Sequence, residues 1–156
     1  MKNFTINLPL ILKMVYLYIN TDIPKAHSFL NLPLKSTMAE LTEVSLKINE
    51  LLPQLSDFID QFNHLVCTTN INVISDVSGN MSIDVPRTMP DAEGEKISKR
   101  ISIIDRLITT RGEQINDLLQ KGLSIETKLK SQNSNYTSQL LDKINEFKRL
   151  NASYKH

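Results

Sequence analysis

Apolar residues between positions 37 and 67 recur in alternating steps of three and four, which is the pattern of a helix that packs along another helix. We call this row of positions the first seam. Three more apolar residues widen the apolar face beyond the seam, which indicates packing against more than one neighbour; they are Leu52, Ile59 and Val66. The seam itself is Leu41, Val44, Ile48, Leu51, Leu55, Phe58, Phe62 and Leu65.

The ends and the middle of this element carry their own signals. Thr37 and Glu40 have the spacing of a capping box, so we predict a first long helix over residues 35–67. Pro53 lies inside the pattern, where proline removes a backbone hydrogen bond and clashes with the preceding turn. Because the apolar register continues in phase beyond it, we expect one helix kinked near Leu51 and Leu52.

A second long helix is predicted over residues 93–130, with Asp91 or Thr88 as its cap. Arg111 and Gly122 interrupt its apolar seam. The arginine can extend to solvent or pair with an acid, and the glycine permits a close helix approach or a local bend. The seam consists of Ile97, Ile101, Ile104, Ile108, Ile115, Leu118, Ile125 and Leu129. After the polar residues 131–135, a last helix is predicted over residues 134–154, with Tyr136, Leu140, Ile144, Phe147 and Tyr154 on one face.

Between the long helices, over residues 68–92, the apolar period changes from helical to alternating. A three-residue loop at 78–80 would pair Val77 with Met81 and Val73 with Val85. In that register Ser75 faces Ile83, so the odd positions share one face. A lone hairpin is marginal in water and must lie against the helices. A linker rich in Thr and Asn is the alternative.

Residues 1–34 form an apolar arm that we expect to dock on the main body or on a partner. Pro9 can open a short helix, whereas the residues from Val15 to Ile19 favour a strand. Periodicity does not decide between the two. The apolar run Leu8–Ile19 is too short to span a bilayer, and no small-residue cleavage site follows it. We therefore do not expect a transmembrane segment or secretion.

Charge is distributed unevenly although the formal net charge is only +1. Residues 37–67 hold five acidic residues against Lys47, and residues 93–156 hold twelve basic against eight acidic residues. An acidic helix followed by a basic one favours antiparallel pairing, which such charges steer rather than drive. The alternative is two solvated faces that never meet. Low aromatic content, 6%, and only four glycines suit extended helices.

Candidate chemistry is sparse. His64 and Cys67 share a helix face, but two ligands do not complete a zinc site, and a buried cysteine beside an ordinary histidine is the simpler interpretation. Asp57 and Asp60 lie on the polar side of the first helix. The four glycines are scattered, so no phosphate loop can be built. We expect no catalytic residue, cofactor, metal or small-molecule substrate.

The second helix carries a cluster of basic residues, Lys96, Lys99, Arg100 and Arg106. Glu93, Glu95 and Asp105 interleave with them and no stacking aromatic residue accompanies them, which is typical of a solvated helix face. We do not expect direct recognition of nucleic acid. Cys67 is the only cysteine, so no intrachain disulfide is possible and an intracellular location, nuclear or cytoplasmic, is expected.

The sequence thus predicts a mainly α fold, with two long antiparallel coiled-coil-type helices, an intervening β-hairpin and a shorter C-terminal helix. This order resembles a prefoldin-type coiled-coil arm. It is equally similar to small helical subunits of eukaryotic assemblies such as kinetochore complexes, Mediator and vesicle tethers. We hypothesise a non-catalytic subunit that binds partner helices, with a prefoldin-like chaperone or holdase arm as the alternative. The predicted partner-binding residues are Leu55, Phe58, Phe62, Leu65, Ile101, Ile104, Ile108 and Ile115.

Overall fold

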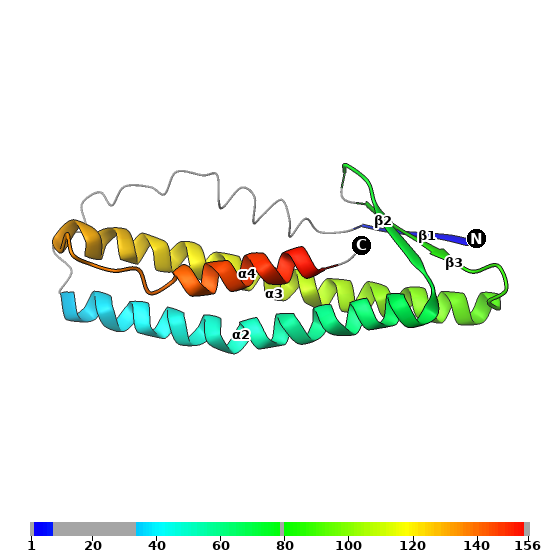
Figure 1. The fold of residues 1–156 in the computed structure, drawn as a ribbon, viewed down its shortest axis with the longest axis horizontal. Helices are drawn as coiled ribbons and strands as arrows, with labels where there is room; N and C mark the ends of the chain where they lie inside the picture. Colours follow the sequence, from blue (N-terminus) through cyan, green and yellow to red (C-terminus); the bar gives the residue numbers. More distant parts are fainter. Residues whose placement is uncertain (1, 8–33, 79, 155–156) are drawn as a thin grey trace.

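The computed structural model describes residues 2–7, 34–78 and 80–154 of the chain. Two long helices, α2 (Leu34–Thr69) and α3 (Asp91–Gln132), run antiparallel and pack against each other. The shorter helix α4 (Leu141–Ser153) returns along them, and a small sheet lies at the end of the pair where α2 ends and α3 begins (Figure 1). The predicted mainly helical fold, with two packed long helices, a hairpin between them and a C-terminal helix, is confirmed.

Helix α2 passes through Pro53 without ending and bends near its middle (Figure 1). Up to Leu55 its buried residues follow the predicted seam. Beyond Leu55 the buried row moves by one position to Ile59, which is 1% exposed, whereas Phe58 is only half-buried. The buried residues Leu51, Leu55 and Ile59 are thus separated by two successive steps of four, where the predicted seam alternates three and four. Such a local shift of the buried row follows a disturbed helical turn.

The predicted capping box at the start of α2 is wrong. The helix begins at Leu34, so Thr37 lies within its first turn and is 2% exposed. Thr37 precedes Leu41 by four residues, which places it on the buried face of the helix. It therefore occupies a packed position inside α2 and not the N-cap position.

The cap predicted for α3 is also wrong. Pro90 occupies the N-cap position with no side-chain cap hydrogen bond, and its carbonyl oxygen accepts from the N–H of Gly94 at 2.9 Å. Asp91 is instead the first helical residue, where with Glu93 it places negative charge beside the positive end of the helix dipole.

The buried face of α3 contains a row of residues in strict alternation of four and three, but several of its positions are small or polar. Ile104, Thr109, Asn116 and Ile125 are buried beside this row. The row is Gly94, Ser98, Ile101, Asp105, Ile108, Gly112, Ile115, Leu119, Gly122, Glu126 and Leu129. Gly122 permits a close approach: a Cβ atom there would lie 2.6 Å from Leu140 Cδ1 and 3.3 Å from Val44 Cγ1. Of its two predicted roles, the structure supports the close approach.

The hairpin between the long helices has a different register from the prediction. Strands β2 (Asn72–Ser75) and β3 (Asn80–Val85) pair Val73 with Ile83 in place of Val85. The turn moves because Asp76 organises it: Asp76 Oδ1 accepts from the N–H of Ser78 at 2.8 Å and of Asn80 at 2.9 Å. The shift is two residues, an even number, so the odd positions still share one face.

A third strand that the sequence did not predict completes the sheet. Strand β1 (Lys2–Asn7) pairs antiparallel with β3, with Phe4 opposite Ile83, in the strand order β1-β3-β2. The start of the arm therefore docks on the main body, and β3 becomes the central strand. Its alternate side chains Met81, Ile83 and Val85 are fully buried. The helix or strand predicted between Pro9 and Ile19 lies outside the described residues.

Helix α4 begins seven residues later than predicted because Glu126 holds the preceding segment in a non-helical turn. The buried Glu126 carboxylate accepts from the Tyr136 hydroxyl at 2.7 Å, the Ser138 hydroxyl at 2.8 Å and the N–H of Gln139 at 2.8 Å. These bonds tie residues 133–140 to α3. The chain then reverses and places Leu140, fully buried, against Gly122.

Candidate partner-binding surface

Six of the eight residues predicted to bind a partner lie in the chain's own core. Their side chains are at most 5% exposed, and they hold α2 against α3 and the neighbouring elements. The six are Leu55, Phe62, Ile101, Ile104, Ile108 and Ile115. The remaining two, Phe58 and Leu65, are half-buried at the edge of that core. A fully buried side chain cannot contact another protein in this conformation, so any partner-binding surface would have to be formed by residues outside these six.

The two sides of the helical pair differ in what covers them. On one side α4 contacts both long helices: Asn63 Nδ2 donates to the carbonyl oxygen of Ser153 at 2.7 Å, and the Tyr154 hydroxyl donates to Asp105. On the other side Arg111 Nε donates to Gln54 Oε1 at 2.7 Å and links α3 directly to α2. Of the two alternatives predicted for Arg111, extension to solvent or pairing with an acid, the structure shows neither in simple form: its guanidinium group donates across the helical pair to the Gln54 amide and, within α3, to Gln114.

Exposed and half-buried apolar residues gather on the side of the Arg111–Gln54 bond. Phe58 follows Gln54 by four residues and Leu107 precedes Arg111 by four, so each lies one turn away on the same face of its helix. Leu107 is 37% exposed, and Ile103, one turn further along α3, is 59% exposed. These are large exposed fractions for apolar side chains on a helix whose other face forms the core.

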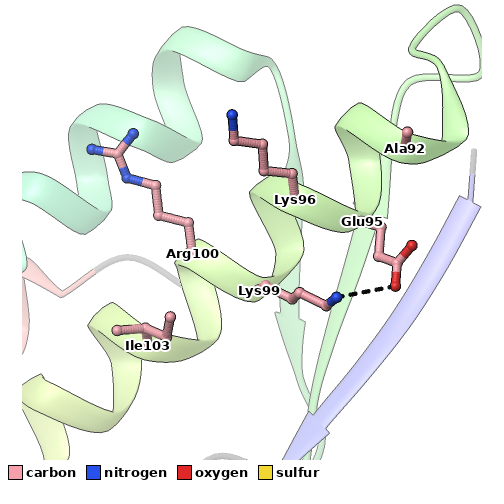
Figure 2. A pocket seen from close by; sticks show the side chains of 6 residues that line it. All are labelled: Ala92, Glu95, Lys96, Lys99, Arg100 and Ile103. Atoms are coloured by element: carbon pink, nitrogen blue, oxygen red, sulfur yellow. Dashed lines mark ion pairs between the residues drawn. The ribbon is translucent and has the colours of Figure 1, made fainter.

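Basic residues lie beside Ile103 and Leu107 on α3, most of them in the turns that precede Ile103. We define the α3 outer surface as Lys96, Lys99, Arg100, Ile103, Arg106 and Leu107, all of which are exposed. A shallow hollow lies over its first turns, lined by Ala92, Glu95, Lys96, Lys99, Arg100 and Ile103. Figure 2 shows Lys99 reaching back to Glu95, 3.3 Å away, while the side chains of Lys96 and Arg100 extend away from that pair.

The α3 outer surface is more basic than the sequence suggested because Asp105 points inward. The prediction that Asp105 interleaves with the basic residues on a solvated face is wrong, since its side chain is only 2% exposed. Asp105 lies seven residues from both Ser98 and Gly112, so the heptad places all three on the buried face. Glu93 and Glu95 are then the exposed acids near the four cations. Lys96, Arg100 and Arg106 form no ion pair within the described part of the chain.

Asp105 and Tyr154 form a buried polar pair between α3 and the end of α4. The Tyr154 hydroxyl donates to Asp105 Oδ1, and the Tyr154 ring lies 4.7 Å from the Phe62 ring between centroids. Burial raises the pKa of Asp105 to about 6, partly opposed by the Tyr154 hydrogen bond, and burial also raises the pKa of Tyr154. The pair therefore ties the end of α4 to α3 and positions α4 on the helical pair.

The raised pKa of Asp105 predicts a specific pH dependence of stability. Between the ordinary aspartate pKa of 3.8 and about 6, the folded chain binds a proton that the unfolded chain has lost. Stability from this group is therefore greatest below pH 3.8 and falls as pH rises through 6. Asp105→Asn removes this titration. As the pH of urea unfolding rises from about 4 to about 7.5, the free energy of unfolding of the variant should therefore increase by up to about 3 kcal/mol relative to that of wild type. A difference that stays constant with pH would contradict the assignment.

The remaining candidate residues stay apart from any site. His64 and Cys67 are both exposed, so the expectation that Cys67 is buried is wrong. Among the described residues, no group of three or more side chains is arranged to hold a metal. Asp57 and Asp60 are exposed on the polar side of α2, where Gln61 Nε2 donates to Asp57 at 3.0 Å.

No described helix is long and apolar enough to cross a lipid bilayer. Comparison of the chain with protein-family models, with curated proteins and with solved structures finds no match. The chain is therefore classed by its fold alone, as an antiparallel pair of long helices with a third helix packed on it and a three-stranded sheet at one end.

Proposed function

We propose that this chain is a non-catalytic helical subunit of a multi-protein assembly and binds partner helices through the α3 outer surface. The assembly is of the kind that kinetochore, Mediator and tethering complexes represent, and an intracellular location, nuclear or cytoplasmic, belongs to the proposal. One observation carries it: Ile103 and Leu107 are exposed one turn apart on the back of a helix whose front face forms the core.

The free energy available from this surface is adequate for a specific contact within a larger interface. Full burial of one large aliphatic side chain stabilises a complex by about 1.5–3 kcal/mol. Ile103 and Leu107 are adjacent, so one partner ridge can cover both, and the surrounding cations select the partner by charge. Phe58 and Leu65 lie at the edge of the core and can extend the same interface onto α2.

The proposal predicts that replacing the two exposed residues removes the partners without unfolding the chain. Ile103→Asp with Leu107→Asp should abolish co-purification of stoichiometric partners at native abundance, because two charges would enter an apolar contact. The matched control is Leu46→Asp, which changes an apolar side chain that is 63% exposed on α2. Circular dichroism should show both variants folded.

Two results would contradict this proposal. One is an unchanged set of partners with the folded double variant. The other is the recovery of no stoichiometric partner with wild type.

A chaperone-like arm is the second candidate, favoured by the position of the hairpin between two long antiparallel helices. It predicts that the purified chain suppresses aggregation of unrelated unfolded proteins and forms no fixed complex. A stoichiometric complex without such activity supports the structural subunit instead.

A further inference from the structure

We infer that the partner segment on the α3 outer surface is an acidic amphipathic helix of another protein, which packs antiparallel or parallel to α3. This inference rests on the proposed function and names the partner's chemistry. The exposed positions Lys96, Arg100, Ile103 and Leu107 follow steps of four, three and four. That is a second seam on the side of α3 away from its core, and such spacing fits the ridges of another helix.

The seam divides into a basic part and an apolar part. Lys96 and Arg100 occupy the turns nearer the sheet, and Ile103 and Leu107 occupy the next turns, over about 16 Å at 1.5 Å per residue. Lys99 and Arg106 flank the row. A partner helix that covers it needs two or more apolar residues at seam spacing, preceded or followed by acids that meet the cations.

Electrostatics disfavour a symmetric dimer of this chain as the occupant. Pairing two α3 outer surfaces about a two-fold axis would place the same four cations on both sides of the contact. The exposed side of α2 is acidic, with Glu43 and Glu50 on either side of exposed Leu46. Pairing it with α3 of a second copy would be a heterologous contact, which closes into a ring or extends into an open chain, so it would appear as self-association that grows with concentration.

The composition of the surface also disfavours nucleic acid and membrane. Ile103 and Leu107 lie beside the cations, where a phosphate backbone would leave them uncovered, and the α3 outer surface itself holds no aromatic side chain that could stack on bases. Two apolar side chains are too few to bury a helix face in a bilayer interface. A helical protein segment satisfies both the apolar and the basic residues.

Binding of designed peptides to the full chain tests this inference. The probe is a labelled helical peptide of about three heptads with Leu at its seam and Glu at its flanks, compared with the same peptide carrying Lys in place of Glu. Fluorescence anisotropy should show that wild type binds the Glu peptide at least about tenfold more tightly than the Lys peptide. Raising the salt concentration from about 0.05 M to about 0.5 M should weaken that binding.

A charge reversal supplies the decisive variant. Lys96→Glu with Arg100→Glu should bind the Glu peptide at least about tenfold more weakly and gain a comparable preference for the Lys peptide. The control, Lys47→Glu with Lys130→Glu, makes the same change in net charge at exposed positions outside the surface. It should retain the wild-type preference.

Several results would overturn the inference: equal binding of the two peptides by wild type, equal behaviour of the two variants, or concentration-dependent self-association of wild type into rings or open chains. Tighter binding of a DNA duplex, or of vesicles with about one-third anionic lipid, than of the Glu peptide would also overturn it. Its failure is separable from that of the proposed function. If partners co-purify and depend on Ile103 and Leu107 but the Glu peptide does not bind, the proposed function stands and only the inference of an acidic partner helix is wrong.

Discussion

Phe62→Ala should lower the free energy of unfolding by about 3–5 kcal/mol, the cost of emptying a buried aromatic site. Phe62 is fully buried in the α2–α3 core, and its ring lies 4.7 Å from that of Tyr154. The substitution therefore removes contacts between α2 and α3 and also the surface on which the end of α4 rests. Urea unfolding followed by circular dichroism measures the change.

Phe58→Ala is the matched control because it removes the same side chain four residues earlier on the same helix. Phe58 is half-buried at the edge of the core, so we expect a loss of about 1–2 kcal/mol, in proportion to the smaller area removed from packing. Equal losses for the two variants would show that the buried row does not shift from Phe58 to Ile59 after Pro53.

Glu126→Ala should destabilise the chain by about 3 kcal/mol, although it removes no apolar contact. The side chain is 6% exposed and accepts three hydrogen bonds from the turn that leads into α4. Hydrogen bonds to an ionised group contribute about 1.5–3 kcal/mol each, and donors near the surface recover part of that from water. Hydrogen exchange should show faster exchange over residues 133–140 before global unfolding.

Glu126→Gln removes the carboxylate but keeps one side-chain oxygen as an acceptor, and so tests the two contributions separately. The amide oxygen can still accept from both Tyr136 and Gln139, which share Glu126 Oε2, but the amide nitrogen in the place of Oε1 is a donor and cannot accept from Ser138. We expect an intermediate loss of stability. If the alanine variant unfolded at the same urea concentration as wild type, the turn would not depend on Glu126.

Hydrophobic periodicity predicted the long helices because both bury apolar residues at regular spacing. It placed Leu55, Phe62, Ile101 and Ile108 in a helix-to-helix seam, where the structure buries them. It could not decide whether that seam closes within the chain, because the same spacing serves internal and intermolecular packing. The structure closes it internally, which moves the proposed partner surface to the back of α3.

The features that periodicity missed are those in which an acidic residue occupies a buried position. Asp105 and Glu126 lie on the buried row of α3, although acidic side chains usually lie at the surface. Each is buried for a long-range reason: Asp105 accepts a hydrogen bond from Tyr154, and Glu126 holds the turn at residues 133–140. Both residues lie at heptad spacing from Ser98 and Gly112, and this spacing was the signal in the sequence that could have revealed them.

The sheet illustrates a second limit of local patterns. Alternation identified the hairpin, but its register depended on the Asp76 side chain, and strand β1 pairs with β3 from about eighty residues away in sequence. A short polar-apolar run such as Lys2–Asn7 carries little information until a central strand is available to pair with it.

Cross-linking mass spectrometry of the native complex tests the central claim most directly, namely that the seam closes within the chain and the back of α3 faces the partner. Lys47 follows Glu40 by seven residues on α2, and Glu40 lies 3.9 Å from Lys121 of α3. We therefore predict an intrachain link between Lys47 and Lys121, with links to partner proteins from Lys96 and Lys99. Partner links from Lys47 alone, with no link between α2 and α3, would contradict the account.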